Sequence, residues 1–183
     1  LIIIPVYING KGPYNFLLDT GVGPMIITEP SLIDTLGLKN LRSTKIYGLG
    51  KGEEIDAYLT QELNANVKEA QIDHIPTAIL KQDVFNLSSY VGKKIYGILG
   101  FYFFDSFVVK ISYTGKRLLF SSPMANTRKK GYKMPLIIEN KRPYINVDMV
   151  TPQQKQIVAK LIVDCGASHA LTMEALDGEA FPV

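Results

Sequence analysis

Short apolar stretches separated by turn-forming residues recur along the chain up to about position 120. The first two, at 2–8 and 14–18, flank the turn sequence Asn9-Gly10-Lys11-Gly12-Pro13. Asn-Gly between two apolar runs is a strong signal for a β-hairpin. Further strand-like runs lie at 44–47, 55–59, 75–80, 107–111 and 117–120. Regularly spaced short strands predict an all-β fold whose sheets close into barrels.

Helical patterns are confined to two short segments. The first spans 30–38, where a Pro-Ser start and Gly37 near the end are typical of helix boundaries. The second spans 101–106 and begins directly after Gly100. We therefore expect strands to dominate the fold.

A strand that runs into an acid occurs twice. Residues 135–147 repeat the pattern of the opening hairpin, and the chain then repeats Leu17-Leu18-Asp19-Thr20-Gly21 as Ile162-Val163-Asp164-Cys165-Gly166. The second aspartate follows the first by 145 residues. A buried carboxylate is costly unless it is paired, hydrogen-bonded or protonated. Two such sites in one chain suggest two carboxylates that face each other.

The segment from Ser121 to Gly131 is rich in turn formers and charge, which makes it the natural boundary between two lobes. We expect a first lobe at 1–122, a linker at 123–133 and the start of a second lobe at 134–183. Only nineteen residues follow Asp164. The second lobe is thus expected to be incomplete in this sequence, and to be completed by further residues or by strand exchange with a neighbour.

Composition excludes several functional classes. The chain has 183 residues, 46% of them hydrophobic, which is enough for a sizeable core. Its net charge of +3 is too small to indicate nucleic-acid or membrane-surface binding, and no apolar run is long enough to span a bilayer. A single cysteine excludes an internal disulfide and leaves the compartment open.

Four motifs in order resemble those of the aspartic proteases, specifically the retropepsin-like and pepsin-like bacterial members with two fused lobes. Residues 19–21 resemble the first Asp-Thr-Gly signature, and 164–166 resemble the second. Residues 45–52 resemble the glycine-rich flap, and 96–100 resemble the apolar-apolar-Gly element. The resemblance covers the first lobe fully and the second only as far as its active-site loop.

The resemblance implies an aspartic endopeptidase in which Asp19 and Asp164 are catalytic. Two carboxylates about 3 Å apart share one proton, so the pair can activate a water and donate a hydrogen bond to the peptide carbonyl without a metal or cofactor. The implied support residues of the two loops are Thr20, Gly21, Cys165, Gly166, Leu99 and Gly100. The implied flap residues are Tyr47, Gly48, Leu49 and Gly50, which would close over an extended, mostly apolar peptide.

The residue after each acid is expected to lock the two loops together through its side chain. Thr20 fits this role, whereas Cys165 replaces the usual hydroxyl with a weaker donor. The side chains of Val22 and Ala167, three residues after each acid, cannot donate to the carboxylates. Fewer donors raise the pKa values of the pair, which predicts maximal activity at mildly acidic to neutral pH.

Other interpretations stay open at this point. The chain could form a retropepsin-like homodimer that uses Asp19 from each copy, or a peptide-binding pseudoprotease that has lost turnover. Each aspartate could be an Asx-turn acid, and Cys165 with His169 could be a nucleophile pair, although a third triad member is missing. The resemblance also implies an extracytoplasmic location, periplasmic or secreted, and a peptide-binding domain after the protease in a full-length chain.

Overall fold

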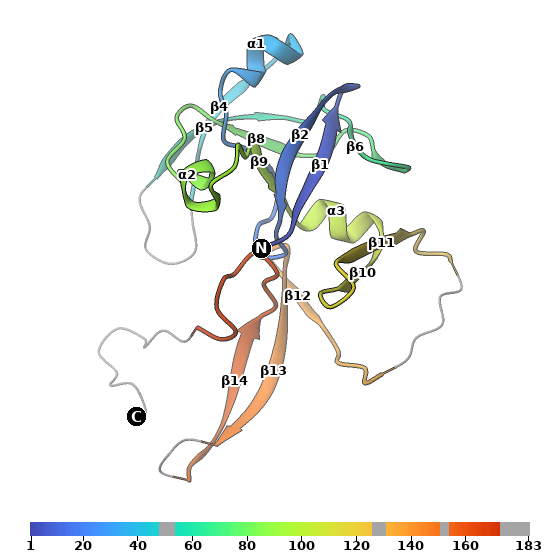
Figure 1. The fold of residues 1–183 in the computed structure, drawn as a ribbon. Coiled ribbons are helices and arrows are strands. Elements are labelled where there is room, and N and C mark those ends of the chain that lie inside the picture. Colours follow the sequence, from blue (N-terminus) through green and yellow to red (C-terminus); the bar gives the residue numbers. More distant parts are fainter. Residues whose placement is uncertain (48–53, 126–130, 151–153, 173–183) are drawn as a thin grey trace.

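A computed structural model describes residues 1–47, 54–125, 131–150 and 154–172, and strands dominate this part of the chain (Figure 1). The strands are β1 Ile3–Ile8, β2 Lys11–Leu18, β3 Met25–Ile27, β4 Arg42–Ile46, β5 Ile55–Thr60, β6 Ala65–Val67, β7 Ala70–Ile72, β8 Thr77–Leu80, β9 Gly97–Leu99, β10 Val108–Ser112, β11 Arg117–Ser121, β12 Ile137–Glu139, β13 Arg142–Val150 and β14 Gln156–Ile162. The helices are α1 Leu32–Leu36, α2 Leu87–Val91 and α3 Phe101–Ser106. The prediction of an all-β fold is confirmed.

The first nine strands form one curled sheet in the order β4-β5-β8-β3-β9-β2-β1-β6-β7. Strand β9 lies between β2, to which it is parallel, and β3, to which it is antiparallel. An added Cβ on Gly97 would overlap the carbonyl of Ile26 on β3, so glycine is what allows these strands to approach. The loop from β2 to β3, which carries Asp19, therefore spans the end of β9.

Two hairpins have the same turn. In β1–β2 the turn residues Asn9 and Gly10 both have positive φ, and β2 begins at Lys11 rather than at the expected Tyr14. In β12–β13 the turn residues Asn140 and Lys141 also have positive φ. This is the geometry of two-residue hairpin turns that match the twist of the strands.

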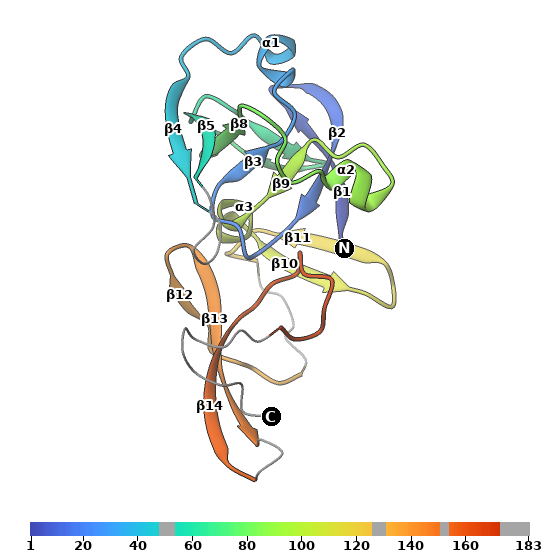
Figure 2. The ribbon, with the colours of Figure 1, turned by 90° about the vertical axis from the view of Figure 1, so that its left-hand side faces the viewer.

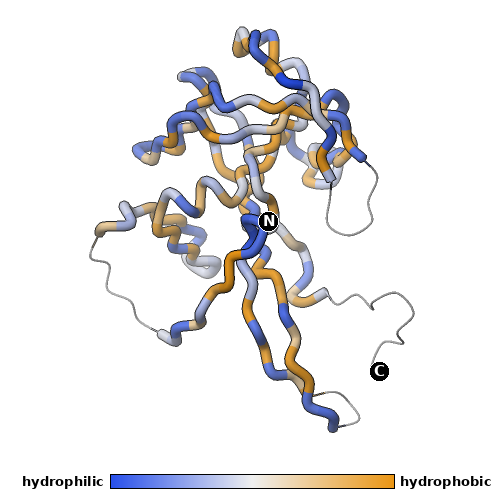
Figure 3. The backbone as a smooth tube through the Cα atoms, turned by 180° about the vertical axis from the view of Figure 1, so that it is seen from behind, coloured by the Kyte–Doolittle hydropathy of each residue, from blue (hydrophilic) through white to orange (hydrophobic). Residues whose placement is uncertain are grey.

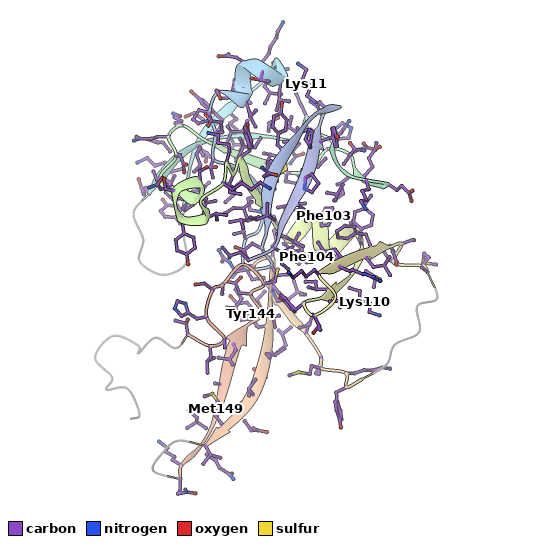
Figure 4. The ribbon with its side chains drawn as sticks, viewed as in Figure 1. Lys11, Phe103, Phe104, Lys110, Tyr144 and Met149 are labelled. Carbon is purple, nitrogen blue, oxygen red and sulfur yellow. The ribbon has the colours of Figure 1, made fainter. Side chains whose placement is uncertain are left out.

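The core is built mainly from the curled sheet, and α1 and α3 add three buried side chains to it. Strand β1 alternates inward and outward, with Ile4, Val6 and Ile8 buried. Helix α3 directs Phe103 into the core, where its ring packs edge-on against Phe120 of β11 (Figure 4). The small β10–β11 hairpin is thereby attached to the first sheet.

Strands β12, β13 and β14 form a separate antiparallel sheet that extends away from the curled sheet (Figures 1 and 2). Hydrophobic and hydrophilic positions alternate along β13 and β14 (Figure 3). Tyr144 lies near the end of β13 that approaches the first sheet, and Met149 lies near its far end (Figure 4). Only the near end of this sheet can contribute to a site shared with the first.

Most of the predicted elements are present, and the short elements β6, β7, β9 and α2 were not predicted as strands or as a helix. Helices α1 and α3 lie within the predicted segments. Strands β6 and β7 and the one-turn helix α2 lack a clear apolar period, and contacts with the rest of the fold stabilise them. In α2, for example, Ser88 Oγ bonds the main-chain N–H and carbonyl of Ile95. Among the described residues no helix is both long and apolar enough to cross a bilayer.

Candidate active site

Asp19 follows directly after β2, and the main chain fixes its position. Its N–H donates to the carbonyl of Leu99 on β9 at 3.1 Å. Its Oδ1 accepts a hydrogen bond from the N–H of Gly21 at 2.7 Å. The side chain is partly buried at the base of the curled sheet. The expected support role of Leu99 thus corresponds to a main-chain hydrogen bond.

Gly100 allows the start of α3 to lie close to the loop that carries Asp19. An added Cβ would overlap the carbonyl of Val22 and lie 2.8 Å from the carbonyl oxygen of Pro24. The N–H of Phe101, the first residue of α3, donates to the carbonyl of Val22 at 2.7 Å. The apolar-apolar-Gly element therefore anchors the chain on both sides of Gly21.

Asp164 follows β14 and has one more main-chain donor than Asp19. Its Oδ1 accepts hydrogen bonds from the N–H groups of Gly166 at 2.7 Å and Ala167 at 3.1 Å. The side chain of Ala167 cannot donate, as expected, but its main chain does. The main chain therefore holds the Asp164 carboxyl group with two hydrogen bonds and the Asp19 carboxyl group with one.

The two loops are bonded to each other through the residues next to the acids. Thr20 Oγ1 donates to the carbonyl of Val163 at 2.5 Å and accepts from the N–H of Cys165 at 3.0 Å. In the opposite direction, Cys165 Sγ contacts the carbonyl of Leu18 at 3.3 Å. The thiol therefore occupies the position related to that of Thr20, with a longer contact and a weaker donor.

Each glycine of the two signatures faces the aspartate of the other. A Cβ on Gly166 would overlap the carboxyl group of Asp19, and a Cβ on Gly21 would lie 3.1 Å from Oδ2 of Asp164. Glycine is needed at position 166 because the carboxyl group of Asp19 occupies the space of a side chain, and at position 21 a side chain would be a tight fit. The arrangement brings Asp19 and Asp164 together.

Burial and the neighbouring acid both raise the pKa of Asp19, from its ordinary value of 3.8 to about 7. Burial is the larger cause, followed by the charge of Asp164 and a hydrogen bond between the two carboxyl groups. The N–H of Gly21 and the guanidinium of Arg142 act in the opposite direction. The pair can therefore hold one shared proton near neutral pH.

The structure describes only the base of the segment that resembles a flap. Strands β4 and β5 pair antiparallel on either side of it, and Lys45 forms an ion pair with Glu54 across the hairpin. Tyr47 is 63% exposed, and its hydroxyl donates to Glu54 at 2.9 Å. The predicted flap residues Gly48, Leu49 and Gly50 lie outside the described residues.

Cys165 is poorly suited to be a nucleophile. Burial raises the pKa of its thiol, which disfavours the reactive thiolate. The nearby His169 is exposed, and its ring nitrogen contacts Ser168. Among the described residues, no group of His, Cys, Asp and Glu side chains could hold a metal ion.

Three residues that contact the paired loops were not expected from the sequence. Val163 bonds Thr20 through its carbonyl, and its N–H donates to the carbonyl of Pro143 at 2.8 Å. Arg142 Nε donates to the carbonyl of Gly21 at 2.9 Å. An Arg-Pro pair after a hairpin turn has no distinctive pattern, so only the packing of the two sheets identifies them.

Strand-rich architecture and two facing Asp-x-Gly turns define the class of aspartic proteases. The sequence profile of the aspartyl protease family matches residues 4–103, which is more than half of the chain. The chain therefore belongs to the aspartyl protease family, whose substrates are peptides or proteins. The match ends before the second signature.

Among 11 chains of solved structures with a significant match is a retropepsin-like aspartic protease from Rickettsia conorii. It is 19% identical, with a TM-score of 0.47, and the match covers 64% of this chain and 80% of that one. No curated protein sequence matched the chain.

Proposed function

We propose that this protein is an aspartic endopeptidase in which Asp19 and Asp164 together activate a water for attack on a peptide bond. The observation that carries the proposal is the pairing of the two loops through Thr20, which leaves the two carboxyl groups in contact. Each acid also faces a glycine of the other loop. No side chain at these two positions therefore separates the two carboxyl groups.

The two carboxyl groups have different surroundings. Asp164 accepts two main-chain hydrogen bonds at Oδ1, whereas Asp19 accepts one and has a pKa raised to about 7. We assign the shared proton to Asp19 and the negative charge to Asp164. Asp164 then removes a proton from the attacking water, while Asp19 donates a hydrogen bond to the carbonyl oxygen as negative charge develops on it.

The substrate in this proposal is an extended peptide with mostly apolar side chains. The β4–β5 hairpin leads into the segment that resembles a flap, and the exposed ring of Tyr47 lies at its base. A flap that closes over the peptide would exclude water from the reacting groups. Main-chain pairing with the flap would hold the peptide extended.

The proposal includes two lobes in one chain, at 1–122 and 134–183, joined by a linker at 123–133. Two observations support it: β12–β13 repeats the turn geometry of β1–β2, and the second sheet carries its own acid to the site of the first. Because Asp164 faces Gly21 of the same chain, a second copy of Asp19 is not needed to form the pair.

Cleavage of an unfolded protein by the full-length chain tests the proposal. We expect activity that pepstatin inhibits and that both Asp19→Asn and Asp164→Asn abolish, whereas Asp105→Asn, an exposed acid on α3, retains it. If Asp19→Asn abolished activity and Asp164→Asn did not, the result would favour the homodimer. Binding of peptides without cleavage at any pH would favour a pseudoprotease.

A further inference from the structure

The turn between β12 and β13 lies against the loop that carries Asp19. The chain reverses at Asn140 and Lys141, which both have positive φ. The side chains that follow contact Tyr102, from Lys141, and the carbonyl of Gly21, from Arg142. A Cβ on Gly23 would lie 3.8 Å from Cβ of Lys141, and the Lys141 ammonium lies 4.9 Å from the ring centre of Tyr102 on α3. The contact therefore involves both the Asp19 loop and the helix behind it.

Arg142 and the next residue bond to both active-site loops. The partly buried side chain of Arg142 donates from Nε to the carbonyl of Gly21 at 2.9 Å. The carbonyl of Pro143 accepts from the N–H of Val163 at 2.8 Å. Val163 in turn accepts from Thr20, the neighbour of Gly21. These contacts form a closed ring that joins the two loops through the start of β13.

We propose that Arg142 is a positioning residue, which holds the Asp19 loop against the Asp164 loop and stabilises the negative charge of the carboxyl pair. This inference rests on the proposed function above. A guanidinium suits the role because its planar donor group directs a hydrogen bond at one carbonyl while it keeps its charge near the acids. A lysine would keep the charge without the fixed direction of the donor.

The charged and polar groups around Asp19 determine in which direction Arg142 changes the pKa of Asp19. Asp164 opposes ionisation of Asp19, while the N–H of Gly21 and the guanidinium of Arg142 favour it. The neighbouring thiol of Cys165 has a pKa raised by burial and stays neutral. Removal of the Arg142 charge therefore raises the pKa of Asp19 further and moves loss of the shared proton to higher pH.

Three variants of the full-length protein separate charge from geometry. Arg142→Met removes both, Arg142→Lys keeps the charge, and Arg117→Met on the exposed start of β11 is the matched control. For Arg142→Met we expect kcat to fall about 10- to 100-fold with KM changed less than about twofold, since misplacement affects the reacting groups most. The alkaline limb of its pH–rate profile shifts upward by about 0.5–1 pH unit.

For Arg142→Lys we expect the alkaline limb to stay near that of the wild type while kcat falls, and for Arg117→Met we expect neither change. If Arg142→Met does not fold by circular dichroism, Arg142→Gln replaces it as a neutral variant that keeps an N–H donor. An Arg142 variant without charge that matches Arg117→Met in kcat and in pH profile would overturn the proposal.

A second measurement does not depend on cleavage. Carboxyl ¹³C NMR titration gives the pKa of Asp19 directly, and we expect it to be higher in Arg142→Met than in the wild type and in Arg117→Met. If the wild type cleaves nothing, the proposed function fails, but this titration still tests Arg142. An unchanged Asp19 titration would show that Arg142 does not stabilise the charge of the pair.

Discussion

The N–H of Cys165 donates to the hydroxyl of Thr20 at 3.0 Å, which makes Thr20 the bridge between the loops that carry Asp19 and Asp164. The same hydroxyl donates to the carbonyl of Val163 at 2.5 Å, so one side-chain oxygen bonds the main chain on both sides of Asp164. The related contact from Cys165 to Leu18 is longer, at 3.3 Å, and comes from a thiol. The hydroxyl of Thr20 thus makes the stronger contact between the two loops, and the thiol of Cys165 makes the weaker one.

Replacement of Thr20 by valine should separate the loops. It keeps the shape of the side chain but leaves the carbonyl of Val163 and the N–H of Cys165 without this partner, which costs about 2–3 kcal/mol of the free energy of unfolding. Cleavage activity should fall with it. Urea unfolding measures the loss, and Thr20→Ser, which keeps the hydroxyl, is the control. Equal stability of the valine and serine variants would contradict the bridging role.

Replacement of Cys165 by serine should strengthen the weaker contact. A hydroxyl is a better donor than a thiol, so we expect Cys165→Ser to be about 1 kcal/mol more stable than the wild type and Cys165→Ala to be about 1 kcal/mol less stable. The alanine variant also tests the nucleophile hypothesis, because it should still cleave peptides. Abolished cleavage in both stably folded variants would revive that hypothesis.

A methyl group at Gly166 should abolish activity. The Cβ of Gly166→Ala would overlap the carboxyl group of Asp19, so the loops must move apart or the acid must turn away. Gly23→Ala is the matched control, because its Cβ would make an ordinary contact of 3.8 Å with Lys141. Peptide cleavage and thermal unfolding of both variants check this. Full activity in Gly166→Ala would mean that the two carboxyl groups do not need this close approach.

The pH dependence of cleavage follows from the raised pKa of Asp19. Below about pH 7 the pair retains its shared proton, and above it the proton is lost, so activity should fall as pH rises through about 7. The expected optimum is mildly acidic to neutral. A pH–rate profile with a natural peptide substrate measures it, and an optimum near pH 2 would contradict the assignment.

Stability should depend on the same group. The pKa of Asp19 is about 7 in the folded protein and 3.8 in a solvated chain, so its protonated form stabilises the fold below pH 3.8 and this contribution is lost as pH rises through 7. Asp19→Asn, which cannot ionise, should therefore gain roughly 2–4 kcal/mol relative to the wild type at pH 8 and little at pH 4. Urea unfolding at both pH values checks the difference. An equal gain in the free energy of unfolding at pH 4 and pH 8 would mean that the substitution acts through packing and not through charge.

Local sequence predicts the parts of this fold whose conformation local residues control. The Asn9-Gly10 turn is one such part, since both residues adopt positive φ there, and α3 after Gly100 is another. Strand β6 was not predicted because its pairing with β1 and the bond from Asn64 N–H to Asn9 Oδ1, at 2.8 Å, come from distant parts of the chain. Arg142 was missed for the same reason.

The sequence by itself determined that two apolar strands each lead into an aspartate with glycine two residues later, because apolar runs and tight turns are local properties. Only the strand before Asp19 ends in buried residues, whereas the strand before Asp164 is partly exposed. Only the tertiary structure decided that the two turns face each other, since this depends on Thr20 reaching the other loop across 143 residues of chain. It also decided the pKa of Asp19, because burial and the charge of Asp164 act through space, and no spacing along the chain encodes them.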